Sequence, residues 1–438
     1  MNSQLFKMSV TEKKPFIIAL IDQLKAILFS TKLMAMLFII FALAMAVGTF
    51  VENSYTTLTA RELIYNAWWF EAIMVFFVIN FLGNIFRFKL WRKEKITTLT
   101  FHLSFILILV GAFVTRYIGF EGIMPIREGE VENTMLSQNV YLTTYIDGKI
   151  DGEPRRRNQS FPLVLSAGLN NNKTINTNFD GTPVSFEILE FIPDAKKGIV
   201  ENPNGVNHLK IVESGDGQRH DHYLKEGEVV NIHNTLFAYN KQTDGAINII
   251  EDKAGNFSIS SPFEGQVMRM SDQQQFRLAK DSVQDFKFRS LYNIGDMQFV
   301  VPEMPIKGIE GLVKSEIINK DQPDGIILKV ISQGEADTLN LIGGKGMLQP
   351  MVQTKVGGFD ISLRYGSKTL ELPFAIKLND FIAEKHPGTE DRTNPSYKSF
   401  ESKVQVVDGS NTYPYDIYMN HVLDHKGYRF FQSSFDPD

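Results

Sequence analysis

The stretch LMAMLFIIFALAMAVGTFV, residues Leu33–Val51, contains no charged side chain and has a charged residue on either side. Two similar runs follow, AWWFEAIMVFFVINFLGNIF at Ala67–Phe86 and ITTLTFHLSFILILVGAFVT at Ile96–Thr115. Each is close to the ~20 residues with which a helix, rising 1.5 Å per residue, crosses about 30 Å of hydrocarbon. One such run alone could be a buried core helix. Three in succession predict a transmembrane region of three helices at residues 33–118.

The basic residues predict how these helices are oriented. The first 32 residues contain five lysines and two acidic residues, whereas the loop at 52–66 contains one arginine and two glutamates. The loop between the second and third runs is basic again, with Arg87, Lys89, Arg92, Lys93 and Lys95. Because positively charged loops remain in the cytoplasm, residues 1–32 and this loop are expected there, and the chain after about Arg116 is expected outside.

The segment before the first run has the pattern of an amphipathic helix. Its apolar residues recur at helical spacing, opposite a polar face: Ile17, Leu20, Ile21, Leu24, Ile27 and Leu28. This pattern fits a helix in the cytoplasmic membrane interface and an extension of the first span equally well. The run Trp68-Trp69-Phe70-Glu71 is assigned to the opposite interface, where tryptophan is enriched, rather than to a cofactor site.

After Phe120 the sequence has the pattern of antiparallel β structure. Asp-Gly pairs, which favour hairpin turns, occur at 147–148, 151–152, 180–181, 216–217, 244–245, 324–325 and 408–409. Alternating or apolar runs between them predict strands at 230–239, 247–250, 298–301, 326–331, 361–365, 370–378 and 404–407. The segment Pro302–Gly311 is the expected divide between two subdomains.

These patterns together predict the fold class. The chain is expected to be a membrane protein of the α plus all-β class, with three N-terminal transmembrane helices. A large antiparallel β domain, sandwich-like or barrel-like, is expected to follow at residues 119–438, outside the cytoplasm.

The composition excludes several classes of function. The chain of 438 residues has 45 basic and 50 acidic residues, a net charge of −5, which argues against a nucleic-acid-binding protein. It contains no cysteine, so that it supplies no disulfide, cysteine-ligated zinc, iron–sulfur cluster or catalytic thiol. No catalytic triad, paired-carboxylate pattern or phosphate-binding loop can be identified from spacing.

His102 is the only histidine in a predicted span. It follows Ile96 by six residues, which places it roughly 9 Å from the cytoplasmic end of the helix. Hydrocarbon disfavours a charged imidazolium, so that the ring is expected to be neutral and to offer a nitrogen lone pair to a metal. Asn80, at matching depth in the second span, is expected to bond the other ring nitrogen. The alternative is a purely structural bond between two helices, worth about 1 kcal/mol or less.

If the metal is haem iron, one imidazole supplies only one of its two axial positions. The second ligand must then come from another polypeptide or from a methionine in the spans, namely Met34, Met36, Met45 or Met74. Apolar packing is the favoured explanation of these methionines.

Two further groups of histidines are weaker metal candidates. His220 and His222 share a face if their segment is a strand, whereas a polar turn after Asp216-Gly217 would explain them equally well. His421 and His425 would share a helical face with Asp424, but the pattern favours a turn at 424–427 and speaks against a metal there.

Several blocks of sequence, taken together, resemble the ResB/CcsB family of system II cytochrome c maturation, in the form found in Bacteroidota and in fused CcsB–CcsA proteins. The blocks are Gly48-Thr49-Phe50-Val51-Glu52, Phe101-His102-Leu103-Ser104, Arg127-Glu128-Gly129-Glu130, Leu372-Pro373-Phe374, Pro387-Gly388-Thr389 and Tyr428-Arg429-Phe430-Phe431-Gln432-Ser433-Ser434. The resemblance covers nearly the whole chain, although residues 135–350 are generic.

The resemblance implies a role in carrying haem from the cytoplasmic side of the bacterial inner membrane to the periplasm. His102 matches the position of the family's axial ligand of haem b, which is bound transiently and shared with a CcsA-like membrane protein. With that partner, rather than alone, the chain would act in a cytochrome c synthase that attaches haem vinyl groups to the Cys-x-x-Cys-His thiols of apocytochrome c. The N-terminus would be cytoplasmic and the large domain periplasmic.

Two points stay open at this stage. Family members continue beyond the position of Asp438 into another span, so that either the partner is a separate chain or the sequence is truncated. The alternative function is a membrane-anchored β domain that acts as a sensor or scaffold without haem, with the spans as a simple anchor.

Overall fold

The computed structural model describes residues 16–215, 218–315, 322–388, 396–433 and 435. Its three long helices are α2 (Thr31–Ser54), α4 (Trp68–Arg87) and α5 (Ile96–Tyr117), and each is long and apolar enough to cross a membrane. They confirm the three predicted spans, and the chain is a multi-pass membrane protein. The helices α1 (Phe16–Leu28) and α3 (Thr57–Ala60), the π-helical turn Arg61–Tyr65 and the 3₁₀ turn Lys93–Lys95 complete the helical part.

The first helix is separate from α2. It ends at Leu28, and the Ser30 hydroxyl accepts a hydrogen bond from the Leu33 amide at 3.1 Å, which caps the start of α2. No residue of α1 is buried, and its apolar side chains, from Phe16 to Ile27, are exposed. That this helix lies in a membrane interface stays a prediction.

Small residues allow the helices to approach closely. A Cβ atom at Gly83 of α4 would overlap the ring of Phe29, which lies between α1 and α2. A Cβ atom at Gly48 of α2 would likewise overlap the ring of Tyr65. Such small positions are typical of interfaces between transmembrane helices, where packing rather than water exclusion holds the helices together.

The strands nearest the helices form a sandwich of two sheets. The first sheet contains β1 (Gly122–Ile123), β2 (Val131–Ile150), β3 (Glu153–Leu163), β20 (Val352–Val356), β21 (Phe359–Lys385), β22 (Tyr397–Asp408) and β23 (Asn411–Tyr418). The second contains β4 (Thr174–Phe179), β5 (Thr182–Ile192), β18 (Asp324–Ser332) and β19 (Glu335–Gly343). Leu142, Phe186 and Leu328 are among the fully buried residues between them.

A second sandwich, which we call the distal sandwich, has its own core around Leu209, Phe237 and Tyr292. One of its sheets contains β6 (Ala195–Gly215), β7 (Gln218–Lys225), β12 (Gly265–Arg269), β13 (Gln275–Leu278), β15 (Ser290–Ile294), β16 (Met297–Val300) and β17 (Ile306–Lys314). The other contains β8 (Val229–Ile232), β9 (Thr235–Tyr239), β10 (Ala246–Glu251), β11 (Phe257–Ser260) and β14 (Gln284–Asp285).

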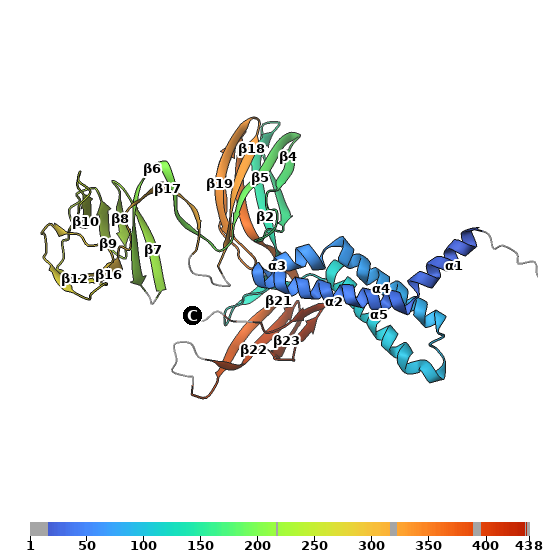
Figure 1. Ribbon diagram of the computed structural model, residues 1–438. Helices are drawn as coiled ribbons and strands as arrows, with labels where there is room; N and C mark the ends of the chain where they lie inside the picture. Colours follow the sequence, from blue (N-terminus) through green and yellow to red (C-terminus); the bar gives the residue numbers. More distant parts are fainter. Residues whose placement is uncertain (1–15, 216–217, 316–321, 389–395, 434, 436–438) are drawn as a thin grey trace, which may run out of the picture.

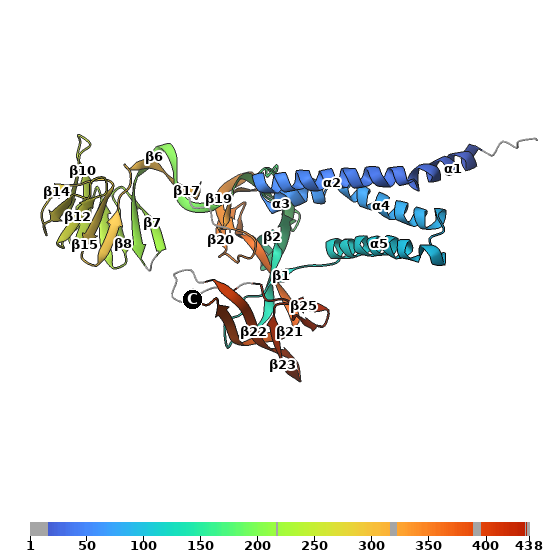
Figure 2. The same ribbon diagram turned by 60° about the horizontal axis from the view of Figure 1, so that its bottom comes forward.

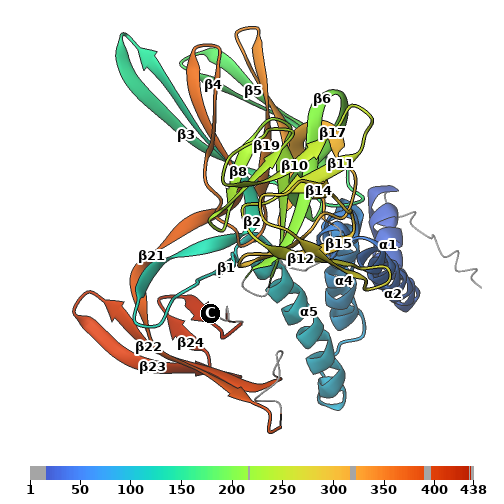
Figure 3. The ribbon, with the colours of Figure 1, turned by 90° about the vertical axis from the view of Figure 1, so that its left-hand side faces the viewer.

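A third core lies in the C-terminal part of the first sheet. There the second half of β21 packs with β22, β23 and the hairpin of β24 (Leu423–His425) and β25 (Tyr428–Phe430). Figure 3 shows β21 passing from the sandwich nearest the helices into this C-terminal sheet.

The predicted antiparallel β structure is confirmed, whereas some of the predicted turns are wrong. The strand pairs that the structure describes are antiparallel except for β9 and β10, which are parallel. Asp151-Gly152 and Asp180-Gly181 form hairpin turns with positive φ at both residues. The turns expected at 147–148 and 324–325 are wrong, because both pairs lie within strands, and the pair at 216–217 lies outside the described residues. At Gly148 and Gly325 a side chain would overlap neighbouring side chains, so that glycine is needed there for space rather than for a turn.

The helical and β parts touch at the loop between α2 and α4. The Thr59 hydroxyl donates to the Ala167 carbonyl at 2.6 Å and lies 2.8 Å from the Ser166 hydroxyl. The strands lie at one end of the helices, whereas α1 and the α4–α5 connection lie at the other end (Figure 2).

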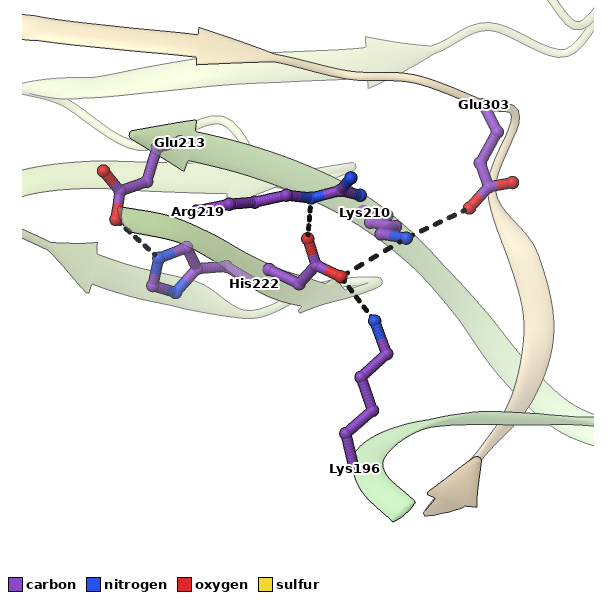
Figure 4. A network of polar contacts seen from close by, with 7 residues as sticks. Lys196, Lys210, Glu213, Arg219, His222 and Glu303 are labelled. Atoms are coloured by element: carbon purple, nitrogen blue, oxygen red, sulfur yellow. Dashed lines mark hydrogen bonds and ion pairs between the residues drawn. The ribbon is translucent and has the colours of Figure 1, made fainter. Parts of the chain in front are cut away.

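A neck made by β6 and β17 joins the distal sandwich to the rest of the β region (Figure 1). The expected divide at 302–311 leads from β16 into β17. Three cations surround Asp221 of β7 beside this neck: Lys196 at 2.8 Å, Arg219 at 3.1 Å and Lys210 at 3.5 Å (Figure 4). Burial raises the pKa of Asp221, but the hydrogen bond from Lys196 and the other cations outweigh it and hold the pKa below its usual value.

We predict that Asp221→Asn loosens the attachment of β7 to the neck. The substitution should lower the free energy of unfolding of the distal sandwich by about 2 kcal/mol, because three cations lose their shared charged acceptor. Since the folded-state pKa is lowered, the stabilisation is complete above the unfolded pKa and is lost as the pH falls through the folded value. Amide hydrogen exchange of β7 at pH 7 and at pH 3 measures both effects.

The control is Asp360→Asn, because Asp360 forms an exposed ion pair with Lys355 at 3.2 Å and should change stability little. Equal exchange rates for β7 in the two variants would contradict the role assigned to Asp221.

Candidate functional site

His102 is the one buried residue of α5, with 8% of its surface exposed. Much of this apolar helix faces outward, including Leu107, Ile108 and Phe113, whereas Phe105, Ile106 and Leu109 pack against the core of the helices. Burying an imidazole rather than an aliphatic side chain is costly in hydrocarbon, and ionisable residues inside membranes generally carry function. The inward side of α5 is therefore the first place to look for a site.

The ring of His102 is held by the backbone of its own helix. Its Nδ1 lies 2.9 Å from the carbonyl oxygen of Thr98, four residues earlier. A carbonyl oxygen only accepts, so that Nδ1 carries the proton and donates it. In the neutral ring Nε2 then keeps its lone pair, which is the form that binds a metal.

Phenylalanine rings surround this imidazole. Phe81 of α4 meets it edge-on with ring centroids 5.3 Å apart, and Phe101 lies 6.2 Å away. Phe105 stacks on Phe81 at 5.3 Å and touches Phe38 of α2, which joins all three spanning helices around the site. Apolar neighbours of this kind suit a flat aromatic ligand.

The expected bond between Asn80 and His102 is not found among the described residues. Asn80 donates instead to the carbonyl oxygens of Leu28 at 2.6 Å and Ser30 at 3.0 Å, and it accepts from Asn84 at 2.8 Å. Asn80 and His102 were predicted to lie at the same depth in the membrane, but this does not place them on facing sides of their helices, because neighbouring residues of a helix point about 100° apart. Phe81 faces His102, while Asn80 faces the junction of α1 and α2.

The four methionines considered as second axial ligands lie in two environments. Met34 and Met74 pack against the apolar core of the helices, together with Phe77 and Phe81. Met36 and Met45 are exposed on the outer surface of α2. These positions agree with apolar packing, and a role for any of them as an iron ligand is untested.

The opposite end of the spans contains a charge pair that the sequence analysis missed. Arg116 of α5 forms an ion pair with Glu71 in the first turn of α4, and Tyr117 donates to the same carboxylate at 2.6 Å. Arg116 also donates to the Tyr65 and Asn66 carbonyl oxygens at 2.8 Å and 3.2 Å. The sequence does contain a signal for this pair, since Glu71 and Arg116 are the charged residues nearest the outer ends of two spans.

The C-terminal histidines bond to protein groups. His425 lies 3.0 Å from the Tyr413 hydroxyl through Nδ1 and 3.1 Å from Asp408 through Nε2. His421 bonds the Asp416 carbonyl at 2.6 Å. The predicted turn at 424–427 is shorter in the structure, because 423–425 form β24 and the turn is at Lys426-Gly427.

Aromatic rings surround this part of the chain. Phe374 packs against His425, Tyr428 and Phe430 with ring centroids 4.6 to 5.9 Å apart. An open hollow of about 370 Å³ lies beside it, where the pairing of β2 with β21 is interrupted. Its lining consists of Val131, Asn133, Leu372, Pro373, Phe374 and Ala375.

The segment of His220 and His222 is a strand, β7, rather than a polar turn. His222 and His233 both approach Glu213 of β6, with Nε2 to Oε1 distances of 3.4 Å and 3.0 Å. Burial raises the pKa of Glu213, but the hydrogen bonds to the two imidazoles outweigh it and hold the pKa below its usual value. Sequence reasoning missed Glu213 and His233, because only the strand pairing brings them to His222.

The C-terminal region is similar to a known protein family. Residues 349–438 match the ResB-like family. Protein NrfI of Wolinella succinogenes is 39% identical over 138 residues, which make up 31% of this chain and 14% of NrfI. The blocks Leu372-Pro373-Phe374 and Tyr428–Ser434 lie within the matched region. The resemblance to the ResB family is thereby confirmed for the C-terminal region, residues 349–438.

We predict that Asn80→Ala destabilises the helical part by about 1–2 kcal/mol, because hydrogen bonds between helices in membranes contribute roughly 0.6 kcal/mol each and Asn80 makes three. Thermal unfolding of the protein in detergent measures the loss.

Asn84→Ala is the matched control. It removes one bond together with Oδ1, a buried oxygen that has no partner among the described residues, and should cost clearly less. Equal losses in the two variants would show that the bonds to Leu28 and Ser30 contribute little.

Proposed function

From the ResB-like region at residues 349–438, we propose that this chain is a haem-handling subunit of system II cytochrome c maturation. It receives haem near the cytoplasmic face of the bacterial inner membrane and presents it toward the periplasm. The observation that carries the proposal is His102, an oriented imidazole buried within a spanning helix.

The proposed orientation places the N-terminus in the cytoplasm and the β region in the periplasm. The basic residues between α4 and α5, from Arg87 to Lys95, lie at the end of the helices away from the strands (Figure 2). Positively charged loops favour the cytoplasmic side, so that the strands belong on the other side.

The residues around His102 fit a haem ligand. The Thr98 carbonyl fixes the ring through Nδ1 and leaves Nε2 for iron, as hydrogen bonds to the far nitrogen of ligating histidines commonly do. Haem b is the cargo in this proposal, and its iron accepts the Nε2 lone pair when it is bound. Phe81, Phe101 and Phe105 supply the apolar surroundings that a porphyrin requires.

Such a subunit requires a membrane partner. One imidazole occupies one axial position of haem iron, and the other position calls for a further ligand. The outward side of α5 presents Phe101, Leu107, Ile108 and Phe113, an apolar surface on which a CcsA-like membrane protein can pack. Apocytochrome c supplies the thiols for haem attachment, since this chain contains no cysteine.

We expect His102→Ala to remove the haem signal. The wild-type chain, purified with its CcsA-like partner, should show the Soret and α bands of reduced haem. The variant should lose most of both bands, because iron loses an axial ligand, and added imidazole should restore them by filling the vacated position. Absorption spectra at equal protein concentration measure the effect.

The control is Asn80→Ala. Asn80 bonds the Leu28 and Ser30 carbonyls rather than His102, so that this variant should retain the haem spectrum despite its lower stability. An unchanged spectrum in His102→Ala would remove this residue from haem binding. Full cytochrome c maturation with the three spans replaced by an unrelated anchor would instead favour the sensor or scaffold function.

A further inference from the structure

One end of the distal sandwich gathers three histidines and a glutamate from two sheets. Glu213 of β6 lies opposite His220 of β7, and Ile211 lies opposite His222. Directly paired residues of antiparallel strands share a face. Ile211 belongs to the core, so that Glu213, His220 and His222 are on the core-facing side. His233, in the turn between β8 and β9, completes the group from the other sheet.

The distances between the ligand atoms are close to those required by a small metal ion. Ligand atoms of Glu213, His222 and His233 all lie within 4.8 Å of one another, and two of the separations are 3.0 Å and 3.4 Å. Zinc binds imidazole nitrogen and carboxylate oxygen at about 2.0–2.2 Å in a tetrahedron, whose ligands are then about 3.3–3.6 Å apart. Small shifts of the exposed His233 would suffice to close the site.

At this end of the sandwich, the basic side chains and Glu213 lie on opposite faces of the sheet. The Glu213 side chain is only 4% exposed and has no lysine or arginine partner among the described residues. The nearby cations Lys196, Lys210 and Arg219 pair with Asp221. Asp221 directly precedes His222 in β7, so that its side chain points to the opposite face of the strand (Figure 4 shows the cations). The partners of this buried carboxylate of Glu213 are imidazoles, which can also bind a metal, and a bound cation would compensate its charge.

We propose that Glu213, His222 and His233 bind a divalent transition-metal cation of the zinc class. His220 stands beside them, with its ring centroid 6.3 Å from that of His233. The side chain of His233 is 57% exposed, so that an ion can enter from solvent and keep a water molecule as a further ligand.

The ligand set favours this class of metal. Imidazole nitrogen suits zinc, copper and nickel, whereas magnesium and calcium prefer sites made entirely of oxygen. A bound ion would link β6 and β7 of one sheet to the β8–β9 turn of the other. It would thus join the two sheets of the distal sandwich. This site is independent of haem binding at His102.

The test measures zinc binding by the full chain in detergent, purified without a polyhistidine tag and treated with chelator, at pH 7.5. Isothermal titration calorimetry and elemental analysis should show one zinc per chain. The unfolding temperature should rise with zinc, because the ion binds the folded form. Magnesium at the same concentration should have no effect.

Two conservative variants identify the ligands. Glu213→Gln keeps the size of the side chain, and His233→Asn suits the positive φ of 45° at that turn position. Each should weaken zinc binding at least about tenfold, since even substitutions beyond the direct ligands cost 10- to 100-fold. His421→Asn, a histidine outside the cluster, should bind zinc like the wild type.

Either of two results would overturn the proposal. Undiminished zinc binding by both variants would place the ion elsewhere, and no binding at micromolar zinc by the wild type would leave the cluster as an ion-pair network. Far-ultraviolet circular dichroism of each variant checks the fold. An altered His102→Ala haem spectrum has no bearing on the outcome, so that the two proposals fail separately.

Discussion

Hydrocarbon offers no hydrogen bonds, and this constraint determines the polar interactions of the helical part. Each polar side chain that the three spans bury must find its partner within the protein. His102 bonds the backbone of its own helix, and Asn80 holds the α1–α2 junction. Arg116 and Glu71 join α4 and α5 at the outer ends. Because the Thr98 carbonyl already satisfies Nδ1 of His102, Nε2 is the nitrogen that the proposed haem iron would bind.

The fold was largely predictable, because its signals are local. An apolar run long enough to cross a membrane has few alternative structures, and the observed helices begin and end within three residues of the predicted spans. Strands with alternating residues were also recognised, but the strand predicted at 230–239 is wrong, because a turn at His233-Asn234 divides it into the hairpin of β8 and β9. Other errors arose where space rather than turn geometry selected glycine, as at Gly148, which packs below the rings of Phe179 and Phe359. Contacts between distant segments of this kind leave no pattern in the nearby sequence.

The contrast between local signals and long-range contacts also explains which site residues the sequence predicted and which it did not. His102 stood out because it is the single histidine in a span, whereas its partner is a backbone carbonyl, which every residue possesses. Glu213 and His233 are separated from His222 by 9 and 11 positions and meet it only through strand pairing and sheet stacking. The type of a residue and its position along a predicted helix or strand indicate the chemistry that its side chain can perform. Its partners depend on the direction in which the side chain points, and this direction is determined by the packing of whole helices and sheets.

The strand β21 has a consequence for where the protein can be divided. Its 27 residues contribute to two hydrophobic cores, and its first half pairs on both edges, with β2 and with β20. A fragment cut at residue 349, where the family match begins, would retain β21 but lose β2, and the long edge exposed in this way would invite aggregation. The region recognised as a family unit is thus not an autonomous folding unit, and fragments for expression should begin before β2.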